Sequence, residues 1–173
     1  DIDKAIELAN QIQAKGYEVT INLMAVSHAR ELELDEALIQ VEKESNVDAL
    51  YLVDSFGALY SEQITHLAKK YKSLMPTKEI GIHAHNNQQL AFANTIEAVI
   101  QNVNFLDGTI FGIGRAAGNC PLELLLGFLK NPKYDLRPIL EILESHFVKL
   151  KEEIEWGYTI PYMITGILDL HPR

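Results

Sequence analysis

Cysteine is almost absent from this sequence, which has a single one, Cys120, among its 173 residues. One cysteine cannot form a disulfide within the chain, so we expect a reducing compartment, the cytoplasm. Long hydrophobic runs are also missing, and no apolar stretch approaches the roughly 20 residues that a membrane-spanning helix needs. The sequence therefore predicts a cytoplasmic protein with no membrane partner.

Basic residues are scarce: 15 Lys and Arg stand against 24 Asp and Glu, and the formal net charge is -9. Nucleic acids and anionic membranes are bound through clustered positive charge, so this balance disfavours both as partners. The chain is 47% hydrophobic and 23% charged, which is typical of a folded globular domain rather than of a disordered segment.

A unit of about thirty residues repeats along most of the chain. Strand-like apolar runs alternate with helix-like stretches; the runs span 17–25, 48–54, 79–85 and 104–112, and the helices fall near 34–45, 61–73, 88–101 and 121–130. Asp35 and Glu36 suit the first turn of a helix that opens after Leu34, and Ser61 suits the cap of the next one. Such a repeat predicts an α/β fold in which right-handed helical crossovers join parallel strands.

Two architectures contain four such units: half of a (β/α)8 barrel, or TIM barrel, and the bulk of a doubly wound sheet. A whole barrel needs roughly 250 residues, so a barrel here would be a fragment. The chain begins without Met inside an amphipathic helix, which we also interpret as the sign of a longer protein. After Pro132 the pattern is helical with no strand, and it indicates an extension beyond the last unit.

Polar side chains follow all four predicted strands, although the strands themselves are apolar. These side chains belong to Ser27 and His28, to Asp54 and Ser55, to residues 83–87, and to the loop 112–119. In both architectures ligands bind where the carboxyl ends of the parallel strands meet. We therefore expect one functional site at that edge of the sheet.

His83 and His85 lie two residues apart at the end of the third run. Side chains alternate across a strand, so both imidazoles point to one side and Ile82 and Ala84 to the other. Two imidazoles placed in this way can bind one divalent cation, with a third ligand from another strand. The spacing alone leaves a second interpretation open, namely two core histidines that are hydrogen-bonded to neighbours.

Other strand-end residues have structural explanations that compete with functional ones. For Asp54 we favour the capping of the next turn, for His28 a hydrogen-bonded loop histidine, and for Arg115 a solvated loop residue. Asn119 is either a turn former or a ligand or substrate contact, and both interpretations stay open. The segment 112–119 matches a dinucleotide fingerprint only partly, and a turn that receives a phosphate or carboxylate group fits it better.

Lysine is missing from the carboxyl ends of the predicted strands. An aldolase that works through a Schiff base on a barrel needs such a lysine. Carbanion chemistry on this scaffold would therefore need a metal ion in its place.

Five segments together resemble the metallolyase barrel superfamily, which contains 4-hydroxy-2-oxovalerate aldolase, isopropylmalate synthase, homocitrate synthase and hydroxymethylglutaryl-CoA lyase. They are INLMAVSHA, LYLVDSFGALYSEQI, GIHAHNNQQLAFANTIEAV, DGTIFGIGRAAGNCPLE and WGYTIPYM, in the order found in the aldolase branch. The resemblance implies that residues 1–130 form the C-terminal half of a TIM barrel and residues 131–173 a helical extension.

The resemblance also implies roles for individual residues. The family's metal-binding histidines fall on His83 and His85, and Asn119 falls on a further metal or substrate contact. Ser27 falls on a serine near pyruvate, and Tyr162 resembles a tyrosine that assists proton transfer. The family's remaining ligand, an aspartate beside a catalytic arginine at the end of the first strand, has no match here.

The activity implied is that of a lyase, a metal-dependent aldolase with Mn²⁺ or Mg²⁺ that forms or cleaves a 4-hydroxy-2-oxo acid through a metal-stabilised enolate. Its partner would be a small 2-oxo acid, and the 173-residue chain alone would be inactive. Asn86 and Arg115 are nearer the synthase pattern, so a Claisen-type acyl-CoA synthase and a non-catalytic barrel module stay open as alternatives. A homo-oligomeric state and an aldehyde dehydrogenase partner stay open as well.

Overall fold

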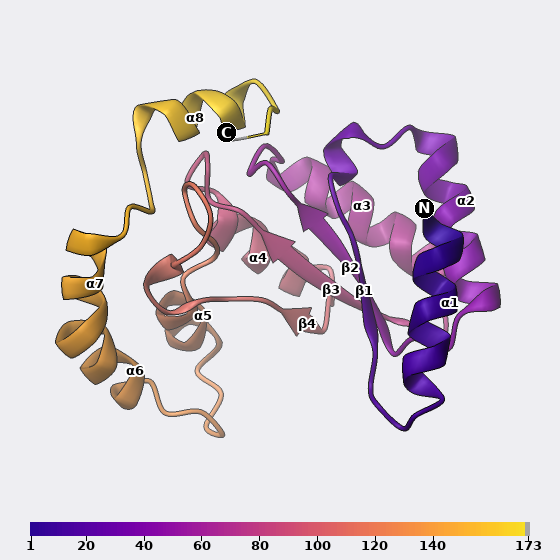
Figure 1. Ribbon diagram of the computed structural model, residues 1–173, viewed down its shortest axis with the longest axis horizontal. Helices are drawn as coiled ribbons and strands as arrows, with labels where there is room; N and C mark the ends of the chain where they lie inside the picture. The colour runs from indigo at the N-terminus through magenta and orange to yellow at the C-terminus, as the bar shows by residue number, and fades with distance from the viewer. Residues whose placement is uncertain (172–173) are drawn as a thin grey trace.

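A parallel sheet of four strands forms the centre of the computed structural model, which describes residues 1–171 (Figure 1). The strands are β1 (Thr20–Leu23), β2 (Ala49–Asp54), β3 (Glu79–Ala84) and β4 (Phe105–Leu106). They are hydrogen-bonded in the order β1-β2-β3-β4. Since neighbours in sequence are also neighbours in the sheet, the polar segments that follow the strands gather along one edge.

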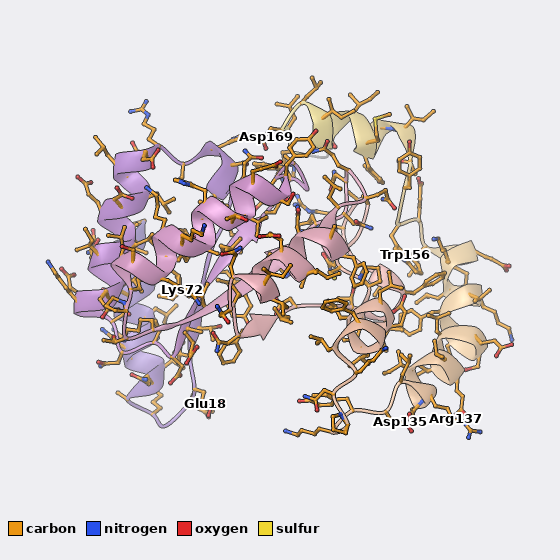
Figure 2. All side chains as sticks on the ribbon, turned by 180° about the vertical axis from the view of Figure 1, so that it is seen from behind. Glu18, Lys72, Asp135, Arg137, Trp156 and Asp169 are labelled. Carbon is orange, nitrogen blue, oxygen red and sulfur yellow. The ribbon has the colours of Figure 1, made fainter. Side chains whose placement is uncertain are left out.

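One helix precedes the first strand, and one helix follows each of the four strands. They are α1 (Ile2–Gln13), α2 (Glu31–Glu44), α3 (Ser61–Leu74), α4 (Ala91–Ile100) and α5 (Leu122–Leu129). Figure 2, seen from behind, has α3 and α4 in front of the strands, whereas Figure 1 has them behind. These two helices therefore cover one face of the sheet.

The hydrophobic core lies between these helices and the sheet. Leu38 of α2, Ile64 of α3 and Leu50 and Leu52 of β2 are 0% exposed, and Ile82 of β3 is too. Each such side chain stabilises the fold by roughly 1.5–3 kcal/mol relative to an exposed one. The apolar character of β2 and β3 thus has a direct cause, because their alternate residues contact the helices.

Several expected boundaries were wrong. Strand β1 covers Thr20–Leu23 instead of 17–25, and α4 begins at Ala91 instead of 88. The run 104–112 is a strand only over Phe105–Leu106, because the chain leaves the ladder at Asp107 and forms a 3-10 turn, η2 (Ile110–Gly112). Helix α2 begins three residues before Leu34, whose side chain is 5% exposed and belongs to the core. Tyr60, not Ser61, caps α3, since its backbone N–H is already bonded to the Gln63 side chain at 2.9 Å.

The described part of the segment after Pro132 contains helices and no strand, as the sequence predicts, and its last helix ends at Ile167. It contains α6 (Arg137–Ile142), a π-helical turn η3 (Leu143–Phe147), α7 (Val148–Glu153) and α8 (Ile160–Ile167). Trp156, labelled in Figure 2, is 4% exposed and donates its indole N–H to the Phe111 carbonyl at 3.0 Å. No helix among residues 1–171 combines the length and the apolar character that a membrane span requires.

Candidate metal site at the strand ends

His83 and His85 lie at the end of β3, and their rings project from the same side. The ring centroids are 5.2 Å apart and the ring planes meet at 77°. A histidine nitrogen lies about 2.1 Å from a bound metal, so rings this close can reach one cation. The arrangement is the one that the two-residue spacing on a strand demands.

The Nδ1 atoms of both rings face oxygen acceptors. His83 Nδ1 lies 2.9 Å from Oδ2 of Asp107, and His85 Nδ1 lies 3.3 Å from the carbonyl oxygen of Gly118. A carboxylate and a carbonyl oxygen only accept hydrogen bonds, so the protons of the neutral rings are on Nδ1. Each Nε2 atom therefore keeps its lone pair, which is the form of histidine that binds metals.

The surroundings of His85 keep its ring neutral. Burial, followed by the electrostatic effects of His83 and Arg115, lowers the pKa of His85 to about 4. The hydrogen bond to the Gly118 carbonyl acts in the opposite direction, but it is the weaker influence. At neutral pH no proton competes for Nε2 of this ring.

Asn119 lies against His85 through a short antiparallel bridge. Its Nδ2 atom donates to the Ile113 carbonyl at 3.2 Å, whereas its Oδ1 atom is buried and has no hydrogen-bond partner. A buried acceptor without a partner costs roughly 1–3 kcal/mol, a cost that a bound cation would remove. Gly114 makes this position possible, because a Cβ atom there would lie 2.6 Å from Nδ2.

The donor set that results is two imidazole nitrogens and one amide oxygen. Among residues 1–171 no group of three or more His, Cys, Asp or Glu side chains is placed to hold a metal ion. The mixture of nitrogen and carbonyl oxygen fits a divalent cation of intermediate hardness, and it leaves further coordination positions for other ligands. His83, His85 and Asn119 could thus hold such a cation.

Ser27 and Tyr162 make their hydrogen bonds with or within the C-terminal segment, not with the histidine pair. The Ser27 hydroxyl donates to Oδ1 of Asp169 at 2.9 Å. Tyr162 is in α8, and its carbonyl oxygen accepts a hydrogen bond of 3.2 Å from the Asn87 side chain. Figure 1 shows α8 beside the ends of the strands, so both residues belong to the same end of the molecule as the histidines.

The remaining strand-end residues have structural partners. The Asp54 carboxylate accepts hydrogen bonds from the backbone of Ala58 and Leu59 at 3.0 and 3.2 Å, which is the capping role that we expect from the sequence. His28 Nε2 lies 2.8 Å from the Asp169 carbonyl oxygen. Arg115 is exposed but not merely solvated, because it donates to the Ser55 carbonyl at 3.1 Å.

Two partners of the histidines escape sequence reasoning. Asp107 directly follows β4, much as Asp54 ends β2, and this repetition is the signal that could have identified it. The overlong prediction for the fourth strand hid it. The Gly118 carbonyl has no signal in the sequence, because its role depends on the path of the backbone in the last loop.

The model of the HMGL-like family matches residues 1–145. The chain belongs to the HMGL-like family. It is 33% identical over 130 residues to an oxaloacetate decarboxylase of Mycobacterium tuberculosis, which covers 75% of this chain and 38% of that protein. It is 33% identical over 128 residues to a 4-hydroxy-2-oxovalerate aldolase of Thermus thermophilus, which covers 72% of this chain and 37% of that protein. The chain thus spans less than half the length of these HMGL-like relatives.

Solved structures agree with the HMGL-like assignment. The N-terminal domain of a candidate aldolase from Bacteroides vulgatus has a TM-score of 0.87 and 33% identity, over 99% of this chain and 57% of that one. The HMG-CoA lyase of Bacillus subtilis has a TM-score of 0.71 at 18% identity, over 94% of this chain and 58% of that one, and it shows the fold alone. The four parallel strands and their helices are therefore part of a TIM barrel, as expected.

Proposed function

We propose that this HMGL-like chain carries the metal-binding strand of a divalent-metal-dependent aldolase. The enzyme would cleave a 4-hydroxy-2-oxo acid to pyruvate and an aldehyde, or form the acid from these two compounds. The metal would be Mn²⁺ or Mg²⁺. The aldolase relatives support the reaction class. The observation that carries the proposal is the pair of histidines with both Nδ1 atoms bonded to oxygen, beside the buried and unpaired Oδ1 of Asn119.

Each residue of the site would have a defined task. His83 and His85 would hold the cation through Nε2, and Asn119 would contribute its amide oxygen. Asp107 would keep the His83 ring in the correct tautomer and orientation. A divalent cation held there supplies a Lewis acid for a 2-oxo group and stabilises the negative charge of an enolate. Ser27 as a substrate contact and Tyr162 as a proton-transfer group stay predictions.

We also propose that residues 1–130 correspond to the C-terminal half of the barrel and residues 131–173 to a helical extension. The share of the relatives that the chain covers supports this division. On the resemblance, the general base and an arginine belong to the other half of such a barrel. Turnover would therefore need that half, whereas the histidine pair should bind metal without it.

The metal site is tested by calorimetric titration of the 173-residue chain with Mn²⁺. We expect H83A and H85A each to weaken Mn²⁺ binding by at least tenfold, because each removes one of the few protein ligands. H66A is the control, since His66 lies on the exposed surface of α3. Equal Mn²⁺ affinity in all three variants would disprove the site.

The reaction is tested in a polypeptide that joins this chain to the first barrel half of the Thermus thermophilus relative. Mn²⁺-dependent release of pyruvate from 4-hydroxy-2-oxovalerate would support the aldolase. Release of free CoA from acetyl-CoA and a 2-oxo acid would instead identify a Claisen-type synthase. Neither product, with metal binding retained, would point to a non-catalytic barrel.

We propose decarboxylation of oxaloacetate as a second candidate reaction, to be tested in the same joined polypeptide. The Mycobacterium tuberculosis oxaloacetate decarboxylase is as similar to this chain as the Thermus thermophilus aldolase, with 33% identity in both comparisons. Decarboxylation of oxaloacetate also passes through the enolate of pyruvate, so the same cation site would serve it. Release of CO₂ from oxaloacetate without aldol cleavage would favour this reaction.

A further inference from the structure

The loop 110–119, which ends in Asn119, contains two residues with an unfavourable backbone conformation. Phe111 and Ala116 both have a φ of 56°, in the left-handed region. Residues other than glycine adopt this region rarely, and bulky ones least of all, because the Cβ atom then lies too close to the backbone. Such a conformation persists only where neighbouring contacts hold it in place.

The helical extension supplies contacts of this kind to both residues. Trp156 donates its indole N–H to the Phe111 carbonyl at 3.0 Å. The next residue, Gly157, donates its backbone N–H to the Ala116 carbonyl at 3.1 Å. The Trp156 ring also meets the Phe111 ring edge-on, with the centroids 6.0 Å apart. Two consecutive residues of the extension thus hold the two strained residues of the loop.

The residues that follow Phe111 hold Asn119 in place. The Gly112 carbonyl accepts a hydrogen bond of 3.0 Å from the backbone N–H of Asn119. The Ile113 carbonyl accepts one of 3.2 Å from the side-chain nitrogen of the same residue. The position of Asn119, and with it that of its unpaired Oδ1 atom, therefore depends on the turn that contains Phe111.

The residues beside Ala116 hold the acceptor of His85 in place. Gly118 donates its backbone N–H to the Arg115 carbonyl at 2.9 Å, and its own carbonyl oxygen lies 3.3 Å from Nδ1 of His85. Trp156 passes beside the same glycine, since a Cβ atom on Gly118 would lie 3.4 Å from Cδ1 of the indole ring. The contacts of the extension thus lead, within one or two residues, to atoms of the candidate metal site.

We propose that Trp156 is a positioning residue for the candidate metal site. Its indole N–H holds the loop 110–119 in the conformation that presents Oδ1 of Asn119 to the cation and the Gly118 carbonyl to His85. The backbone N–H of Gly157 acts with it. Groups that orient metal ligands typically change metal affinity about 10–100-fold when they are lost. The proposal rests on the metal site proposed above, and it makes the extension a part of that site.

A purely structural role for Trp156 predicts something different. A ring that only fills space would lower the stability of the fold when it is replaced, and it would leave the folded metal site unchanged. The substitution W156F removes the indole N–H and keeps an aromatic ring. V41A is the control for a general loss of stability, because Val41 is fully buried in α2, which lies at the β1 end of the sheet, whereas α6 and α7 of the extension lie at the β4 end (Figure 1).

The first measurement reads the tautomers of both histidines from the ¹⁵N chemical shifts of their rings in the metal-free 173-residue chain at pH 8, well above the ordinary histidine pKa of about 6.5. We expect Nδ1-protonated rings in the unsubstituted chain and in V41A. In W156F we expect a mixture of tautomers for His85 and no change for His83, whose acceptor Asp107 lies outside the loop 110–119.

Mn²⁺ titration of the same variants gives a second comparison. The affinity for Mn²⁺ should be about tenfold lower in W156F and unchanged in V41A. Identical His85 tautomers and Mn²⁺ affinities in W156F and V41A would overturn the proposal.

The indole proton provides a further test, because Trp156 is the only tryptophan of the chain. Its N–H gives a single NMR signal, whose exchange with solvent reports on the hydrogen bond to the Phe111 carbonyl. If this bond and the cation stabilise the same loop conformation, each must favour the other. Saturating Mg²⁺ should therefore slow the exchange of this proton several-fold, and it should have no such effect in H85A. Equal exchange with and without bound Mg²⁺ in the unsubstituted chain would contradict the coupling.

The metal site and the positioning role can fail separately. A chain that binds neither Mn²⁺ nor Mg²⁺ would contradict the proposed function. The His85 tautomer in W156F would still decide whether Trp156 orients the loop, because that measurement needs no cation.

Discussion

The side-chain amide of Asn119 has one hydrogen-bonded atom and one buried atom without a partner. Its nitrogen is bonded to the Ile113 carbonyl at 3.2 Å, whereas its oxygen is buried and has no partner. Such an atom makes the metal-free fold less stable than it could be. In the proposed site this oxygen would gain a partner when the cation binds, so a substitution here tests both metal affinity and metal-free stability.

The substitution N119D is expected to lower the stability of the metal-free chain and to raise its affinity for Mn²⁺. A carboxylate at this position removes the donor of the Ile113 carbonyl and buries a charge, so the metal-free chain should lose about 1–3 kcal/mol of unfolding free energy. The negative oxygen should also raise the affinity for Mn²⁺. Thermal unfolding with and without Mn²⁺ measures both effects, and a variant whose Mn²⁺-induced rise in Tm is no larger than that of the unsubstituted chain would contradict the prediction.

Asp54 gives the molecule a pH dependence with a definite sign. Burial raises the pKa of Asp54 to about 6, and the hydrogen bonds from Ala58 and Leu59 only partly oppose this. A pKa that is higher in the folded state means that stability is greatest below the unfolded value of about 3.9 and is lost as the pH rises through 6. The loss amounts to at most about 3 kcal/mol.

D54N should abolish this decline. Urea unfolding at pH 4, 5, 6 and 7 should show that the difference in unfolding free energy between D54N and the unsubstituted chain shifts in favour of D54N as the pH rises. The comparison cancels His85, whose pKa is lowered to about 4, so that its contribution is instead lost as the pH falls. A difference that stays constant from pH 4 to pH 7 would rule out the titration of Asp54.

At the scale of elements, α8 is docked on the loop after β3 through a glycine. A Cβ atom on Gly166 would lie 2.8 Å from Cβ of Asn87 and 2.9 Å from Cγ of Gln88. Asn87 also donates to the Tyr162 carbonyl at 3.2 Å and to the Thr165 hydroxyl at 3.1 Å. The helix therefore approaches this loop as closely as its backbone allows.

G166A should separate α8 from the loop. We expect a loss of about 1–3 kcal/mol, as is usual when extra atoms are forced into a packed contact, and faster hydrogen exchange over Ile160–Ile167. G127A, in the open surface of α5, should instead gain roughly 0.5–1 kcal/mol because alanine favours helices. Equal exchange of α8 in both variants would show that Gly166 is not a contact point.

The sequence predicts some elements better than others for physical reasons. β2 and β3 are continuous apolar runs because the helices cover them, so their bounds differ from the expected ones by one residue at most. β4 is short because the chain turns away after Asp107, whose backbone N–H still donates to the Ile82 carbonyl at 3.1 Å, and the apolar pattern cannot reveal where such a turn begins. The histidine pair could be identified from its spacing on a strand, because that spacing is local. The partners of the two Nδ1 atoms are distant in sequence, so only the folded structure identifies them.

At the scale of the whole molecule, burial is unevenly distributed. The helices α6 and α7 and the turn η3 between them have no buried residue, whereas β2 and β3 contain Leu50, Leu52, Ile80 and Ile82, all at most 2% exposed. Segments with few buried apolar contacts open locally at low free-energy cost. The extension and the sheet should therefore differ in stability.

Native-state hydrogen exchange should reveal this gradient. We expect the amides of β2 and β3 to exchange only through global unfolding, and those of α6 and α7 to exchange several orders of magnitude faster through local opening. Trp156, which bonds to the Phe111 carbonyl, should mark the border between the two regimes. Protection of α6 and α7 equal to that of the strands would contradict this view of the extension.

The turn that contains Asp169 joins two distant parts of the chain. Its carboxylate accepts a hydrogen bond from the hydroxyl group of Ser27, which is 142 residues away in the sequence, and its backbone carbonyl lies against the ring of His28. Any rearrangement of this turn would leave both groups with water in place of protein. A conformational change after α8 would thus alter the surroundings of the residues that follow the first strand.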